Sequence, residues 1–242
     1  MKILMTGSSG FIGQHLTARL KDHNVHHMVS DLREHKAVTD EVIAIKPDII
    51  VHLAARTEVE QSFYEQITFS EINYVGTVNL IEAAAKVKNL KNFVFASTME
   101  VYGWQPISDE VEKYSMPDNF VAFDENTQPN PNAPYGNFIH VTDMLDAWQT
   151  VIENPDKCND GMIFTIGPNN PIKIKDYAEL IASKIGFTGK INWDTKLFRA
   201  GEIYWLNSNN TLITERLGWE PKVSLDEGLD KTIDYWRGKL EG

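Results

Sequence analysis

The chain has 242 residues, of which 42% are hydrophobic and 24% charged, as in an ordinary globular protein. Its formal net charge of −11 argues against a nucleic-acid partner, because such proteins present a basic surface to phosphates. The single cysteine, Cys158, excludes an internal disulfide and is typical of a reducing compartment. We see no signal-peptide pattern and no apolar run of bilayer length, so we expect a cytoplasmic protein that does not engage a membrane.

The first hundred residues alternate short apolar runs with amphipathic helical patterns, which is typical of a parallel sheet covered by helices. We predict strands at 2–6, 26–30, 49–53 and 93–97. Helices are predicted at 11–20, 38–45 and 72–86, the second of them ended by Pro47. The predicted fold class is therefore α/β, with a Rossmann-type doubly wound parallel sheet.

A glycine-rich segment joins the first predicted strand to the first predicted helix, with Gly7, Gly10 and Gly13 at three-residue spacing. The first glycine can adopt the positive φ of a tight turn, the second lets backbone approach a ligand, and the third lets helix pack closely on strand. The helix would then point its positive dipole end at a pyrophosphate. Glycines alone could serve a structural turn, but the strand–turn–helix context favours a dinucleotide site. The predicted cofactor contacts in this loop are Gly7, Ser9, Gly10, Phe11, Ile12 and Gly13.

An acidic residue follows the second predicted strand, where a ribose-binding carboxylate is expected. Asp31 could accept both hydroxyls of the adenosine ribose, which favours NAD over NADP. Only residues 32–39 separate it from Asp40, so the usual second and third strands are compressed, and Asp31 could instead contact adenine or cap the next helix. Arg33 could accommodate a 2′-phosphate, which keeps NADP as the less favoured cofactor.

Prolines, asparagines and acids replace the periodic pattern between residues 103 and 134, which is typical of a long surface loop. Beyond it we expect strands at 137–141 and 162–166 and helices at 143–153 and 176–185. Ser224 and Glu227 have capping-box spacing and should begin a last helix that reaches Trp236. We divide the chain into an NAD-binding domain, residues 1–136, and a remainder, residues 137–242. That remainder would complete the sheet and supply a small α+β substrate-binding part.

Several motifs, taken together, resemble those of the extended short-chain dehydrogenases/reductases that act as nucleotide-sugar epimerases and dehydratases. Besides the glycine loop, they are His-Leu-Ala-Ala at 52–55, an asparagine-and-glycine helix at 73–80, Ser-Thr-Met-Glu-Val-Tyr-Gly at 97–103, Pro-Tyr-Gly at 134–136, Phe-Ile-His-Val-Thr-Asp at 138–143, Arg-Ala-Gly-Glu at 199–202 and Leu-Gly-Trp-Glu-Pro at 217–221. Any one of them could arise by chance, but their order from end to end favours this family. The resemblance implies NAD as cofactor, a nucleotide sugar as substrate, and further cofactor contacts from Leu53, Ala54, Ala55 and Asn73.

The resemblance also implies catalytic roles for a tyrosine and a threonine. Tyr135 would remove the proton of a sugar hydroxyl while a hydride passes to NAD, and Thr98 would hydrogen-bond the same oxygen. An unperturbed tyrosine has a pKa of about 10, so its phenolate needs a nearby cation at neutral pH. The family's cation is a lysine four residues later, where this chain has Ile139. Tyr135 could also be an ordinary loop tyrosine beside prolines.

The sequence after Gly136 runs directly into a motif that lies well downstream in the family. We therefore infer an internal deletion that removes the lysine-bearing helix, the next strand and the first substrate loops. Because that helix commonly forms the dimer interface in the family, activity and homodimer formation are both open. The alternative to an enzyme is a catalytically impaired NAD-binding pseudoenzyme or regulatory module.

Other residues bear on reaction type and substrate. Glu100 resembles a base of sugar dehydratases and decarboxylases, although an exposed carboxylate needs no special role. Met99 stands where the dTDP-glucose 4,6-dehydratases have an aspartic acid, and a thioether cannot donate a proton, so a UDP-sugar 4-epimerase-like reaction is favoured. Arg199 resembles the arginine that binds the substrate pyrophosphate through its planar donor fork, or is a surface arginine. No metal site is expected from the three histidines at 23–27, because adjacent residues of a strand point to opposite faces.

Overall fold

The computed structural model describes residues 1–98, 138–158, 161–170, 172, 174–191 and 208–240. The chain forms two compact units. The first comprises Met1–Ala96 with Trp148–Gly161, and the second comprises Ser97–Ala147 with Met162–Gly242. None of the described helices is long and apolar enough to cross a membrane.

A four-stranded parallel sheet forms the centre of the first unit. Its strands are β1 (Lys2–Thr6), β2 (Asn24–His27), β3 (Ile49–His52) and β4 (Asn92–Phe95). They lie in the order β2-β1-β3-β4, and each adjacent pair is parallel. After β2 the chain passes to the other side of β1, so the β1/β3 junction is a topological switch point, where α/β sheets bind ligands. The Rossmann-type fold class is thus confirmed.

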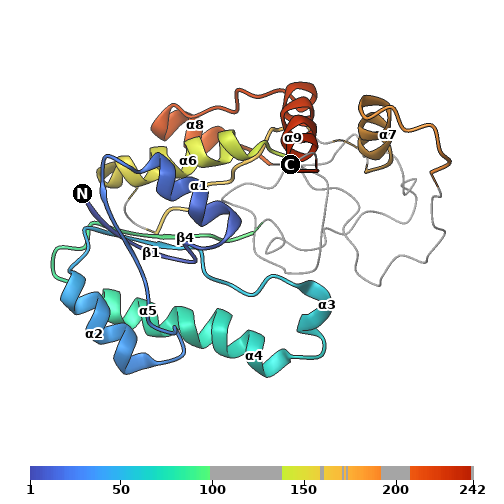
Figure 1. Cartoon of the computed structure of the whole chain (residues 1–242). Coiled ribbons are helices and arrows are strands. Elements are labelled where there is room, and N and C mark those ends of the chain that lie inside the picture. The colour runs from blue at the N-terminus through green and yellow to red at the C-terminus, as the bar shows by residue number, and fades with distance from the viewer. Residues whose placement is uncertain (99–137, 159–160, 171, 173, 192–207, 241–242) are drawn as a thin grey trace, which may run out of the picture. The chain divides into compact units, whose positions relative to one another are not determined.

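Helices cover both faces of this sheet (Figure 1). α1 (Phe11–Arg19) lies on one face, and α2 (His35–Ile45) and α5 (Gly76–Ala84) lie on the other. Between β3 and α5 the chain also forms α3 (Val59–Ser62), α4 (Gln66–Ser70) and the π-helical segment η1 (Glu71–Val75). On one face, Leu4 of β1 and Ile50 of β3 share a buried cluster with Val42 of α2 and Leu80 of α5. Side chains alternate along a strand, so Met5 points the other way, toward α1.

The predicted elements of the first unit all form, β1 with the predicted ends and the others with shifted ones. The strand expected at 26–30 ends at His27, because the Val29 and Ser30 N–H groups donate to the two carboxylate oxygens of Glu41, at 2.9 and 2.8 Å, rather than to a neighbouring strand. The helix expected at 72–86 is the last part of a longer run formed by α4, η1 and α5. Its Gly76 allows close approach to the β2–α2 connection, since a Cβ there would lie 2.9 Å from Leu32 Cβ.

The second unit is helical in its described part. It contains α7 (Ile174–Lys184), α8 (Thr211–Leu217), α9 (Leu225–Leu240) and the start of α6 (Val141–Glu153), which ends among residues of the first unit, before the 3-10 turn η3 (Pro155–Lys157). Buried Asp143 accepts the N–H groups of Lys222 and Val223 through Oδ2, at 3.0 and 2.8 Å. The predicted cap of α9 is confirmed, because the Glu227 N–H donates to Ser224 Oγ at 3.2 Å, and the helix continues past Trp236 to Leu240.

Two predicted strands of the later chain are wrong. Residues 138–140 form no strand in the described structure, and Val141 begins α6, where the Thr142 N–H donates to His140 Nδ1 at 3.3 Å. Residues 162–166 form no strand, and the next peptide groups bond to a side chain: Asn210 accepts from the Gly167 N–H at 3.1 Å and donates to its carbonyl at 2.5 Å. Apolar runs predict burial, whereas a strand also needs a backbone partner.

Candidate active site

The turn after β1 requires glycine at two positions. Gly7 has φ +66°, and a Cβ on it would lie 2.7 Å from both Ala54 N and Leu53 C. A Cβ on Gly13 would lie 2.3 Å from the Gly7 carbonyl oxygen. No other residue type fits either position without moving the backbone. The conformations predicted for the first and third glycines of the loop are therefore present.

Gly10 differs from its two neighbours, because a Cβ there would meet only the Gly7 carbonyl oxygen, at 3.3 Å. Gly10 is the N-cap of α1, and in the described structure this helix start has no side-chain cap and no acid in its first turn. The first amides of a helix have no partner inside it, and they carry the positive end of its dipole. The start of α1 is thus an electrostatic fit for a phosphate group. Contacts from Ser9, Gly10, Phe11 and Ile12 remain predictions.

The segment after β3 lies against the glycine turn. Thr6 Oγ accepts the N–H groups of Leu53 and Ala54, at 3.2 and 3.1 Å. The Asn73 carboxamide binds the backbone of Arg56 with two hydrogen bonds. It accepts the Arg56 N–H at 2.8 Å and donates to the Arg56 carbonyl at 2.9 Å. The structure therefore brings residues 53–55 beside the glycine turn, as the cofactor prediction requires, and gives Asn73 the task of holding that segment.

His52 links these two regions, a role that the sequence reasoning did not assign. Its ring is 1% exposed, with Nδ1 2.7 Å from Thr6 Oγ and Nε2 2.8 Å from Thr77 Oγ. The Thr77 hydroxyl also donates to the Asn73 carbonyl at 2.7 Å. Burial lowers the pKa of His52 to about 4, so the ring is neutral at pH 7. The sequence feature that could have indicated this role is a histidine at the end of an otherwise apolar strand, because a buried imidazole needs hydrogen-bond partners.

Asp31 forms a turn in the middle of the β2–α2 connection, residues 28–34. Its carboxylate accepts the Arg33 guanidinium, with the closest contact at 2.6 Å, and the Arg33 N–H at 3.0 Å. Hydrogen bonding from Arg33 lowers the pKa of Asp31 to about 2. The N-cap of α2 is Glu34, so Asp31 does not cap that helix. Both partners of the pair are 45% exposed, and ribose binding by Asp31 stays a prediction.

The predicted catalytic residues are only partly described. Thr98 is exposed and follows β4 by three residues, whereas Glu100, Tyr135 and Arg199 lie outside the described residues. Ile139, at the position of the family's lysine, lies in the non-helical segment ahead of α6. Within the described ranges, no group of three or more histidine, cysteine or acidic side chains could hold a metal ion.

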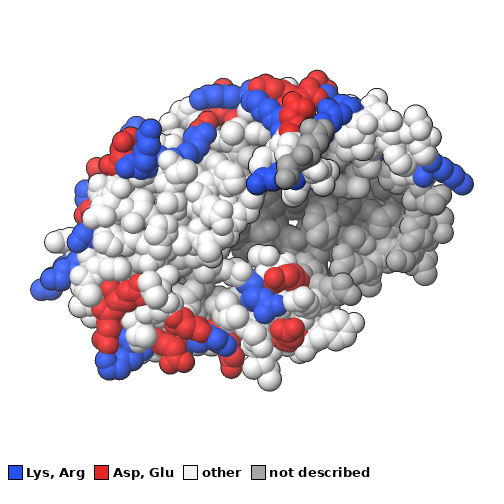
Figure 2. All heavy atoms as spheres, in the orientation of Figure 1, with Lys and Arg blue, Asp and Glu red and all other residues white. Residues whose placement is uncertain are grey.

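Charged side chains of both signs are interspersed on the visible face (Figure 2). Lys36 pairs with Asp40 on α2, and Lys231 pairs with Glu227 on α9 at 2.7 Å. Among the described residues of that face, Figure 2 shows no broad basic area of the kind that binds a nucleic-acid backbone.

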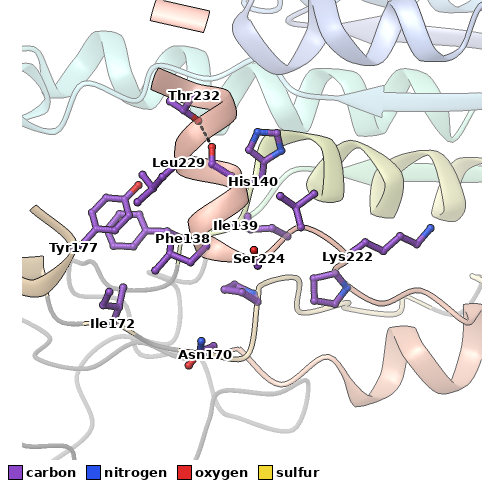
Figure 3. A pocket seen from close by; sticks show the side chains of 15 residues that line it. Phe138, Ile139, His140, Asn170, Ile172, Tyr177, Lys222, Ser224, Leu229 and Thr232 are labelled. Carbon is purple, nitrogen blue, oxygen red and sulfur yellow. Dashed lines mark hydrogen bonds between the residues drawn. The ribbon is translucent and has the colours of Figure 1, made fainter. Parts of the chain in front are cut away.

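The second unit contains a cavity of about 340 Å³ lined by residues of α7, of α9 and of the segment at 138–140 ahead of α6 (Figure 3). The rings of Phe138 and Tyr177 stack along one wall, with centroids 3.9 Å apart and planes 6° from parallel. His140 and Lys222 contribute polar groups, and Ile139 also lines the cavity. Its volume is in the range of small-molecule sites, but none of the predicted cofactor, substrate or catalytic residues lines it.

Comparison with known proteins identifies the family. The model of the NAD dependent epimerase/dehydratase family matches residues 3–137, more than half of the chain. The chain belongs to the NAD-dependent epimerase/dehydratase family. This confirms the family predicted from the motifs and, with it, NAD as the family's cofactor.

Relatives that match almost the whole chain have several activities. The chain is 23% identical to human dTDP-D-glucose 4,6-dehydratase over 327 residues, covering 98% of this chain and 90% of the relative. The Thermotoga maritima UDP-glucose 4-epimerase, solved with UDP-glucose, has a TM-score of 0.80 at 22% identity, covering 99% of this chain and 100% of that one. The Bacillus anthracis dTDP-glucose 4,6-dehydratase, solved with NAD, has a TM-score of 0.78 at 20% identity, covering 100% and 98%. At these identities the solved structures show the fold alone.

The alignment with the human relative also bears on the deletion inferred after Gly136. It runs over 327 positions, whereas this chain has 242 residues, so at least 85 aligned positions have no counterpart here. The family match ends at residue 137, between the motif at 134–136 and the motif at 138–143, which is farther downstream in the family. Both findings agree with an internal loss relative to longer relatives.

Proposed function

We propose that this protein binds NAD at the glycine turn and acts on a nucleotide sugar by transient hydride transfer, in the manner of a UDP-sugar 4-epimerase. The observation that carries the proposal is the turn itself. Gly7 and Gly13 are required by its backbone, while a Cβ on Gly10, the N-cap of α1, would meet only the Gly7 carbonyl oxygen, at 3.3 Å. Membership of the NAD-dependent epimerase/dehydratase family supports the same reading.

In this proposal the cofactor site consists of the glycine turn, residues 53–55 and Asp31. The amides at the start of α1 would receive the pyrophosphate, and residues 53–55 would form the neighbouring wall, held there by Thr6 and Asn73. Asp31 would accept the adenosine ribose hydroxyls while it remains paired with Arg33. When bound, NAD would supply the hydride acceptor.

Four other residues would handle the sugar nucleotide. Tyr135 would take the proton of the reacting hydroxyl, Thr98 would hydrogen-bond the same oxygen, and Arg199 would bind the substrate phosphates. Glu100 would act at a neighbouring carbon if the reaction includes an elimination. Methionine at position 99 disfavours that route, because its thioether cannot donate a proton to a leaving hydroxyl.

A second candidate function is NAD binding without turnover, and Ile139 favours it. A phenolate at Tyr135 needs a cation to form at neutral pH, and position 139 supplies an alkyl group instead. The shortfall of at least 85 aligned positions against the human relative points the same way. Such a chain would be a binding or regulatory module, and homodimer formation would need a surface other than the missing helix.

Turnover and cofactor binding, measured on the same preparation, separate the candidates. Purified protein would be mixed with NAD and with UDP-, dTDP- and GDP-sugars, while NADH absorbance and sugar products are followed. An epimerised UDP-sugar with transient NADH is the expected result. Bound NAD without any product would leave the second candidate, and the absence of NAD binding would reject both.

A further inference from the structure

A closed ring of hydrogen bonds lies behind the glycine turn in the first unit. It runs from Thr6 to His52, on to Thr77 and Asn73, and returns through the backbone of residues 53–56. We call this arrangement the His52 ring. It joins the ends of β1 and β3 to the helical run of η1 and α5.

The proton positions in the His52 ring follow from its partners. The Thr77 hydroxyl donates to the Asn73 carbonyl, which can only accept, so the His52 Nε2 must carry a proton and donate to Thr77 Oγ. A neutral imidazole then has a bare Nδ1, which accepts the proton of the Thr6 hydroxyl. Thr6 Oγ in turn accepts two amides, from Leu53 and Ala54.

The Thr6 hydroxyl in this arrangement is fully used. Thr6 donates once and accepts twice, which is the whole capacity of a hydroxyl group. If Nδ1 also carried a proton, Thr6 Oγ would face three donors with two lone pairs, and one of the amides would lose its partner. Only one tautomer of His52, with the proton on Nε2, satisfies all the groups together.

The ring acts on the part of the molecule that surrounds the cofactor turn. Thr6 directly precedes Gly7, and a Cβ on Gly7 would already collide with the peptide of residues 53–54. The position of that segment therefore sets how closely it packs against the turn. The ring fixes the segment at both ends, at residues 53–54 by Thr6 and at Arg56 by Asn73.

We propose that His52 is a positioning residue for cofactor binding, which in its Nε2-protonated form holds the glycine turn and residues 53–56 at the separation that NAD requires. This inference rests on the proposed function, since it concerns the same NAD site. His52 itself is buried and acts through Thr6 and Thr77 rather than by touching the cofactor.

Thr77 offers the most selective test, because its hydroxyl can be removed with little change in volume. Thr77→Val leaves the His52 Nε2–H without an acceptor, while Thr77→Ser keeps the hydroxyl. Thr232→Val is the matched control: Thr232 also donates to the carbonyl four residues earlier, at 2.8 Å, with no imidazole involved. His52→Phe removes both hydrogen bonds of the imidazole, to Thr6 and to Thr77, and serves as the stronger variant if it folds.

NAD affinity at pH 7 would be measured by calorimetry, and the His52 tautomer by ¹H–¹⁵N correlation spectra of the imidazole. We expect a His52 imidazole protonated on Nε2 in the wild type and in Thr77→Ser. These two proteins should have similar Kd values for NAD. Thr77→Val should raise the Kd for NAD roughly tenfold, because the free variant would shift residues 53–56 to relieve the unpaired N–H and NAD binding would have to reverse that shift. Thr232→Val should bind NAD as the wild type does.

A wild-type protein whose His52 imidazole is protonated on Nδ1 would overturn the inference. It would equally be overturned by a Thr77→Val protein that melts at a lower temperature but binds NAD unchanged, because the ring would then be only structural. If the wild type bound no NAD, the proposed function would fail instead. The spectra would still decide whether the His52 imidazole has the inferred tautomer.

Discussion

The glycine turn and the segment that follows Gly136 differ in what they retain of the machinery expected from the family. At the turn, Gly7 and Gly13 stand where a Cβ would strike the backbone, and the start of α1 faces outward uncapped in the described structure. At position 139 an isoleucine lies ahead of α6, where the family resemblance calls for a lysine after a tyrosine. In the proposed function, cofactor binding and proton transfer would therefore be separable, because one would depend on backbone geometry and the other on a single cation.

The largest expected effect is the loss of turnover when Tyr135 is substituted, which would separate proton transfer from cofactor binding. If Tyr135 is the base, Tyr135→Phe should lower kcat by about 10²–10⁴-fold, the usual contribution of general acid–base catalysis, without changing the Kd for NAD. Steady-state rates with the best UDP-sugar and NAD titrations would measure the two. Tyr64→Phe, at a tyrosine that is 83% exposed, is the control and should behave as the wild type. A Tyr135→Phe enzyme with full activity would remove the assignment.

A second prediction tests the rigidity of the turn. A Cβ at Gly13 would lie 2.3 Å from the Gly7 carbonyl, so Gly13→Ala should lower the free energy of unfolding by about 3 kcal/mol or more. Urea denaturation measures this change. Gly238→Ala is the control, since a Cβ there meets nothing within 4 Å, and inside α9 it should raise stability by about 0.5–1 kcal/mol. Equal stabilities of the two variants would contradict the packing described for the turn.

The third prediction concerns pH and the His52 ring. Burial lowers the pKa of His52 from 6.5 to about 4, so the folded protein binds this proton less readily than the unfolded chain. The free energy of unfolding should therefore be highest above pH 6.5 and fall between pH 6.5 and 4, by about 3 kcal/mol from this group.

Comparison with His52→Phe isolates the contribution of His52 from that of other groups. The difference in unfolding free energy between wild type and variant should shrink as the pH falls through that window. NMR titration of His52 in the wild type gives the pKa directly and does not depend on the variant folding. A His52 that titrates near 6.5 in the folded protein would be incompatible with a buried neutral ring.

The smallest effects are expected at Asp31. Asp31 and Arg33 are each 45% exposed, so solvent screens the pair, and Asp31→Asn should change the free energy of unfolding by less than ~1 kcal/mol. If the carboxylate also binds the ribose hydroxyls, the same variant should raise the Kd for NAD roughly tenfold. An unchanged Kd would assign Asp31 to the turn alone.

What the sequence could predict depends on how local the cause is. Glycine spacing predicts the turn, because a positive φ and a close approach leave no alternative residue at positions 7 and 13. The runs at 137–141 and 162–166 have strand-like composition, but a strand also needs a neighbour, which composition does not contain. The His52 ring was missed for a related reason: its bonds join residues 46 and 25 positions apart.

The most direct test of NAD binding at the turn is a calorimetric titration of NAD into the wild type and into Gly10→Val. A Cβ at Gly10 meets only one carbonyl oxygen, at 3.3 Å, so the variant should fold, with a circular dichroism spectrum like that of the wild type. We predict saturable binding at one site in the wild type and no measurable binding in Gly10→Val, because the branched side chain would fill the space of the pyrophosphate. A folded Gly10→Val protein that binds NAD with wild-type affinity would contradict the account.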